Sequence, residues 1–154
     1  MKKVTFLTVA AIMLLAASCG QKVTIGGTYS FGNDVTKEPV GSVMVYPIDD
    51  NSVFFYLEVC MGPPAYNSGS MLGKMTIKDN VGIYDSKIDN EFLTCVLKFE
   101  FSADQLKITT DETDDYCGFG HGVSADHTYK LTDKSIPQGY ETMEGDFIKF
   151  EDLK

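Results

Sequence analysis

Two histidines, at positions 121 and 127, are the only imidazoles of the chain. Asp126 stands beside His127, so this segment could supply three ligands to zinc, or a general base with its orienting partner. The five-residue gap between the histidines is not a usual zinc spacing, and Ser124 lacks the glycine frame of a nucleophile elbow. We therefore expect exposed loop histidines, with neither a metal site nor a catalytic site.

Four carboxylates lie within residues 111–115, in the order Asp-Glu-Thr-Asp-Asp. Several oxygen ligands from one loop suit calcium, but the alternating ligands, central glycine and final glutamate of an EF-hand are absent. A solvated acidic hairpin tip is therefore expected, with calcium titration as the test of the alternative. The glycine-rich segment 117–123 lacks the lysine and hydroxyl that end a phosphate-binding loop, so no cofactor is expected there.

The first 18 residues are organised like an export signal. Lys2 and Lys3 precede an apolar stretch, residues 4–17, that is too short for a comfortable bilayer span. Small residues then lead to Cys19, in the order Ala-Ala-Ser-Cys-Gly, and this resembles the bacterial lipobox. The resemblance implies a small lipoprotein, cleaved before Cys19 and acylated (palmitate-type chains) on that cysteine. The alternatives are an ordinary signal peptide cut elsewhere and an N-terminal membrane or buried helix.

Removal of residues 1–18 leaves 136 residues, enough for one domain with a real core. We expect an acylated tether over 19–26 and a single domain over 27–154. In the lipoprotein resemblance, Gly20 is not the aspartate that retains many lipoproteins in the inner membrane, which implies the outer membrane. Residues 21–23 lack the acidic cluster that marks surface export in Bacteroidota-like lipoproteins, which implies the periplasmic face.

The charge of the chain excludes one class of partner. The full chain carries −9, and without the two lysines of the signal it carries −11; no arginine is present. Nucleic-acid binding needs a cationic face, so that function is not expected. Membrane attachment should come from the acyl anchor alone. A cationic protein would be attracted, although net charge also simply keeps an exported domain soluble.

Three cysteines remain after Cys19, and an exported chain meets an oxidising compartment. We expect a disulfide between Cys95, on a strongly patterned strand, and Cys117, which opens the glycine-rich loop after the next strand. Cys60 has apolar neighbours, and either a buried free thiol or an intermolecular link is expected. A catalytic Cys60 would need a nearby histidine, and both histidines are far along the chain.

Period-two alternation predicts β-strands throughout. It is clearest at residues 93–101, which with 105–109 predict a hairpin. Further strands are expected at 28–31, 42–46, 52–59, 74–77, 82–85, 127–131 and 146–150. The predicted fold is all-β, a single antiparallel barrel or sandwich of about eight or nine strands. The opening Gly27-Thr28-Tyr29 resembles the first strand of lipocalin-like meanders, without their tryptophan.

Two loops are expected to carry binding residues, because long loops on a rigid scaffold commonly do. They are residues 61–71, which include Tyr66 and Asn67, and residues 111–127. Residues 117–130, CGFGHGVSADHTYK, resemble a signature of small exported proteins that include lysozyme inhibitors, roughly C-G-x-x-V-x-x-D-G-T-Y. That resemblance implies a compact β-barrel that inserts a loop Ser and Tyr into an enzyme cleft, with Ser124 and Tyr129 as the loose equivalents.

The leading hypothesis is a non-enzymatic envelope lipoprotein that binds a cationic protein such as a lysozyme. The alternative is a lipocalin-like carrier of a small hydrophobic ligand, with Phe54 and Tyr56 on one face lining its cavity. An uncharacterised envelope enzyme is a third hypothesis, and a purely structural role is a fourth.

Overall fold

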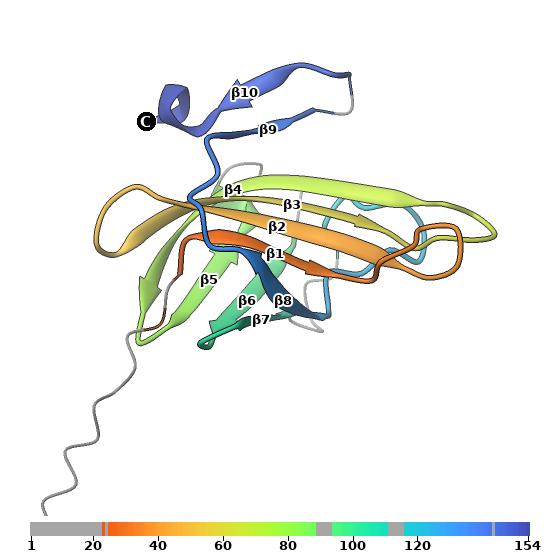
Figure 1. Cartoon of the computed structure of the whole chain (residues 1–154), viewed down its shortest axis with the longest axis horizontal. Helices are drawn as coiled ribbons and strands as arrows, with labels where there is room; N and C mark the ends of the chain where they lie inside the picture. The colour runs from red at the N-terminus through yellow and green to blue at the C-terminus, as the bar shows by residue number, and fades with distance from the viewer. Residues whose placement is uncertain (1–22, 24, 89–93, 111–115, 143) are drawn as a thin grey trace, which may run out of the picture.

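The computed structural model describes residues 23, 25–88, 94–110, 116–142 and 144–154, and these form strands with two short 3-10 helices (Figure 1). The elements in chain order are β1 (Gly27–Phe31), β2 (Val40–Pro47), β3 (Ser52–Cys60), β4 (Ser68–Lys78), β5 (Val81–Asp85), η1 (Ser86–Ile88), β6 (Val96–Phe101), β7 (Gln105–Thr110), β8 (Thr128–Asp133), β9 (Gly139–Glu141), β10 (Phe147–Lys149) and η2 (Phe150–Leu153). Among these residues no helix has the length and apolar character needed to cross a membrane. The signal peptide and Cys19 lie outside the described residues.

Strands β1 to β8 form a closed antiparallel barrel, in which each strand pairs with the next one along the chain. Strand β8 returns to pair with β1, where Tyr29 lies opposite Leu131 and Ser30 lies opposite Lys130. The prediction of an all-β meander that closes into a barrel is confirmed. Closure pairs both edges of this sheet, which removes the exposed strand edges that favour aggregation.

The inside of the barrel is filled by alternating apolar side chains. In β6, Leu97 and Phe99 are fully buried and Phe101 is nearly so, which confirms the predicted alternation of this strand. The strand begins at Val96, because the described residues just before it bond elsewhere. The N–H of Thr94 donates to the Tyr116 carbonyl at 3.2 Å. The predicted hairpin between this strand and β7 is also confirmed.

Strand β4 is longer than the sequence indicated. It pairs with β3 over nine residues, from Cys60 opposite Ser68 to Ser52 opposite Thr76, and the predicted strand covered only 74–77. The loop expected at 61–71 therefore ends at residue 67. Glycine in this strand reflects packing, since a Cβ at Gly73 would lie 2.5 Å from the ring of Tyr84.

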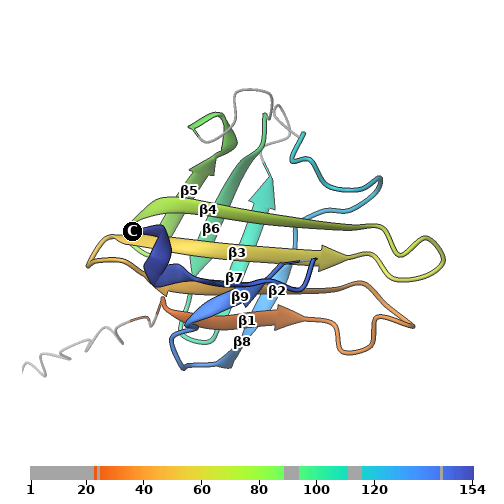
Figure 2. The same ribbon diagram turned by 90° about the horizontal axis from the view of Figure 1, so that it is seen from above.

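The chain leaves the barrel after Asp133, so the domain predicted over 27–154 contains a second element. Strands β9 and β10 form a separate two-stranded sheet that lies, with η2, over the outer face of β2, β3 and β4 (Figures 1 and 2). Only the second of these strands was predicted, and it ends at Lys149 because Phe150 begins η2. We call residues 134–154 the C-terminal hairpin.

Aromatic stacking holds the C-terminal hairpin on the barrel. The ring of Tyr140 stacks on Tyr56 with centroids 4.0 Å apart, and Phe150 stacks on Tyr46 at 5.3 Å. Phe54 and Tyr56 share a face, as predicted, but that face points outward to the hairpin. The prediction that these two residues line a ligand cavity is wrong, and Phe55 faces the interior in their place.

Candidate binding surface at the long-loop end

Three long connections lie at one end of the sheet formed by β1 to β4. They are residues 32–39 between β1 and β2, residues 61–67 between β3 and β4, and residues 116–127 before β8. In Figures 1 and 2 they project together at the right, and the first described residues of the chain lie at the opposite end. We call these three segments the long-loop end.

The two loops predicted to carry binding residues meet at this end. The side-chain amide of Asn67 donates to the carbonyl of His121 at 2.7 Å, and the N–H of Gly120 donates to the carbonyl of Ser68 at 3.0 Å. The ring of Phe119 lies against Gly69, where a Cβ would clash with it. The loops therefore form one continuous surface.

A disulfide fixes the third loop to the barrel wall. Cys95 and Cys117 are bonded, as predicted, with their Cα atoms 4.5 Å apart. At the other end of the loop, one oxygen of Asp126 accepts hydrogen bonds from the N–H and the hydroxyl of Thr110, both at 2.6 Å. Residues 116–127 are thus attached at both ends, which preorganises the surface that they form.

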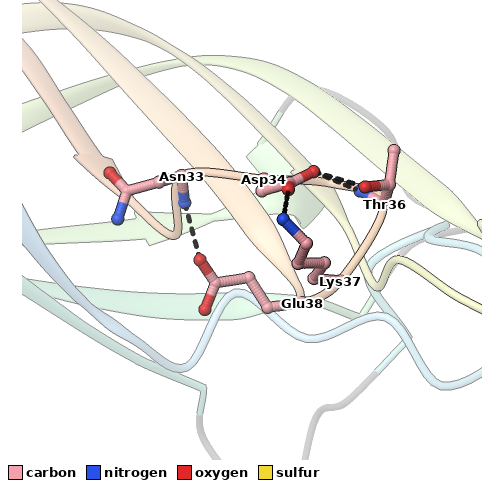
Figure 3. Close-up of polar contacts among 5 residues, drawn as sticks. All are labelled: Asn33, Asp34, Thr36, Lys37 and Glu38. Carbon is pink, nitrogen blue, oxygen red and sulfur yellow. Dashed lines mark hydrogen bonds and ion pairs between the residues drawn. The ribbon is translucent and has the colours of Figure 1, made fainter.

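The loop between β1 and β2 is ordered by its own polar contacts (Figure 3). Asp34 accepts from the N–H of Thr36 at 3.0 Å and forms an ion pair with Lys37 at 2.6 Å. The hydrogen bond from Lys37 is the main cause that lowers the pKa of the Asp34 carboxyl. Glu38 accepts from the N–H of Asn33 at 2.9 Å and so closes the loop on itself.

Three of the four predicted contact residues are accessible at the long-loop end. Tyr66 is 49 % exposed and has a positive φ of 53°, Asn67 is half-buried beside it, and Ser124 is exposed. Tyr129 is fully buried, and its hydroxyl donates to the Ala125 carbonyl at 3.1 Å. The prediction that Tyr129 contacts a partner is wrong, because its position in β8 directs the ring into the core.

The side chains considered for a metal or catalytic site do not form a cluster among the described residues. His127 stacks on Phe31 with centroids 3.8 Å apart, and burial lowers the pKa of its imidazole against an opposing effect of Asp126. His121 is exposed. No group of three or more His, Cys, Asp or Glu side chains suited to a metal ion occurs among the described residues. The acidic cluster 111–115, the candidate calcium site, lies outside the described residues.

Cys60 is a free, half-buried cysteine at the end of β3. Its thiol donates to the carbonyl of Tyr66 at 3.7 Å. The thiol is therefore only half-buried, in contrast to the buried free thiol that was one of the two expectations for Cys60.

Next to these loops, on the outer face of β1 to β4, lies a groove of about 510 Å³. Its polar lining includes Ser30, Ser42, Glu58 and Ser70, none of which was predicted as a site residue. These residues are far apart in the sequence, and only the strand register brings them together. The available signal was the serines at outward-facing positions of β1, β2 and β4.

No family model matches the chain, and no curated protein or solved structure matches it significantly.

Proposed function

We propose that this chain is a lipid-anchored, non-enzymatic binding module of the cell envelope, and that its long-loop end binds a cationic protein. The observation that carries the proposal is the junction of the loops 61–67 and 116–127 into one fixed surface, at the end of the barrel opposite the first described residues of the chain. A module held at one end is free to contact a partner at the other. The proposed location is the outer membrane, facing the periplasm.

Charge favours a cationic partner at this surface. The described loops 32–39, 61–67 and 116–127 carry Asp34, Glu38 and Asp126 against one lysine, Lys37, which is already paired with Asp34. The sequence adds four more carboxylates between Thr110 and Tyr116. Such an excess of one sign steers an oppositely charged protein during its approach.

The likeness of residues 117–130 to the lysozyme-inhibitor signature suggests a lysozyme as the partner to test first, because lysozymes are strongly cationic. Tyr66 is the expected aromatic contact, since exposed aromatic side chains often contribute most of the binding energy at interfaces. Ser124 and Asn67 are the other two predicted contact residues that are accessible at the long-loop end.

The lipid anchor predicts a specific N-terminus. Mass spectrometry of the protein purified from its native membrane should find Cys19 as the first residue, carrying acyl chains. Two or three chains would hold the protein stably, whereas one would not. An intact Met1, or an unmodified N-terminus at another residue, would end this part of the proposal.

The binding surface is tested with the soluble chain from Gly20 onward and hen lysozyme in a low-salt titration. Tyr66→Asn removes the exposed ring and tolerates the positive φ, so folding should be unaffected. We expect roughly tenfold weaker binding, corresponding to about 1.4 kcal/mol. Added salt should weaken binding of the unaltered protein as well.

The matched control is Ile83→Asn, which removes a similarly exposed apolar side chain from the outer face of β5. This variant should bind as the unaltered chain does. An absence of any lysozyme binding or inhibition at low salt, or an equal loss in both variants, would contradict the proposed surface.

A further inference from the structure

The groove of about 510 Å³ beside the long-loop end has a size typical of small-ligand sites. It lies on the outer face of β1 to β4, and the C-terminal hairpin packs on another part of that face, on β2, β3 and β4. Its apolar lining includes Val35, from the loop between β1 and β2, and Val40, at the start of β2. The groove therefore adjoins the loop between β1 and β2 and extends from it along the outer face of the strands.

The groove exists because one line of paired residues across the sheet consists mainly of serines, whose side chains are small. Ser30 pairs with Ser42, Ser42 with Glu58, and Glu58 with Ser70, so these four residues form a continuous line across β1 to β4. The neighbouring row in the same strands carries Thr28, Met44, Tyr56 and Leu72, paired in the same way. The floor of the groove is thus a row of hydroxyls around one carboxylate.

Glu58 has no cationic partner among the described residues. One of its oxygens accepts a hydrogen bond from the hydroxyl of Tyr56 at 2.9 Å. Burial, and next the hydrogen bond with Glu58, raise the pKa of Tyr56 to about 12, so this phenol stays a neutral donor at physiological pH. The carboxylate is therefore held in place while its charge remains uncompensated.

We propose that this groove binds an alkylammonium group, with Glu58 as the counter-ion. The serine hydroxyls would accept hydrogen bonds from the ammonium, and the valine side chains would contact its aliphatic stem. A lysine has the same amphipathic form, with an apolar stem and a charged head. Such a group could come from a small free amine or from a lysine of the cationic protein, and only the second source rests on the function proposed above.

Two variants test separately the negative charge of Glu58 and the open volume of the groove. Glu58→Gln removes the charge and keeps an oxygen for the Tyr56 hydroxyl, so the fold should be retained. Ser42→Leu fills the middle of the groove from an outward-facing position of β2. The matched control is Glu100→Gln on the outer face of β6, a half-buried glutamate paired with Lys98 at 2.8 Å.

The probe is Nα-acetyl-lysine methylamide, titrated into the soluble chain and followed by NMR chemical shifts. The norleucine analogue, which lacks the ammonium, is the ligand control. We expect shifts at Ser42 and Ser70, binding weakened roughly tenfold in Glu58→Gln, and binding abolished in Ser42→Leu. Glu100→Gln should bind as the unaltered chain does.

The same variants are then titrated with lysozyme. Weaker binding in Glu58→Gln but not in Glu100→Gln, with no response to the small probe, would support a lysine of a protein as the source. Binding of the small probe without lysozyme binding would support the groove and overturn the proposed protein partner. Equal behaviour of Glu58→Gln and Glu100→Gln with both ligands, or equal binding of norleucine, would overturn the groove proposal and leave the long-loop surface standing.

Discussion

Replacement of Phe55 by alanine is expected to lower the free energy of unfolding by about 3–5 kcal/mol. The side chain is fully buried in the barrel, with its ring 4.8 Å from that of Phe99 and 5.1 Å from that of Tyr84. The variant leaves a cavity where three aromatic rings meet, and the paired strands around it have little freedom to collapse. Urea unfolding followed by circular dichroism measures the loss.

Phe147→Ala is the matched control for that experiment. Phe147 lies on β10 and is 59 % exposed, so its removal should change stability by about 0.5 kcal/mol or less. A similar loss in both variants would show that the core is not organised around Phe55 as described.

Removal of the disulfide should have the second large effect. Cys95 and Cys117 are 22 positions apart, and loop-closure entropy for such a length gives about 3 kcal/mol. The double variant C95A/C117A should unfold at a correspondingly lower urea concentration. Amide exchange at residues 116–127 should also accelerate, because the bond at Cys117 ties this loop to the barrel.

Cys60→Ala provides the internal comparison, since Cys60 is free and half-buried. Its loss should cost about 1 kcal/mol or less, as the weak contact to the Tyr66 carbonyl is the polar interaction that it makes. If Cys60→Ala destabilised the chain as much as C95A/C117A, the proposed role of the disulfide would be contradicted.

The strands that sequence reasoning found are those whose inward residues are large and alternate with polar ones. Leu97, Phe99 and Phe101 identify β6 in this way. The first half of β4 escaped notice because it consists mainly of serine and glycine. Aromatic rings pack against its glycines, Gly69 and Gly73, and leave no room for a larger side chain there. Strand β9 spans three residues and is too short for any periodicity to be visible.

The disulfide was predictable from the positions of Cys95 and Cys117 along the chain. The contact between the two long loops was not predictable in this way, because the sequence does not show that both loops lie at the same end of the barrel. The groove was not predictable either, because its floor joins Ser30, Ser42, Glu58 and Ser70 through strand register, which the sequence does not display. The prediction that Tyr129 is accessible to a partner was wrong for a related reason. It falls in a strand that had been predicted, but the face it occupies depends on how β8 meets β1 and β7.

Barrel closure depends on pairing between the first and the last strand of the barrel. The side chains of Ser30 and Thr132, 102 positions apart, meet across the seam between β1 and β8. During folding β1 can pair at once with β2, the next strand along the chain, but its other edge has no neighbour until β8 arrives. Distant pairing of this kind forms slowly, and an unpaired edge can recruit a second copy of the chain. Refolding at high concentration should therefore lose material to intermolecular strand exchange at β1, and dilution should recover it.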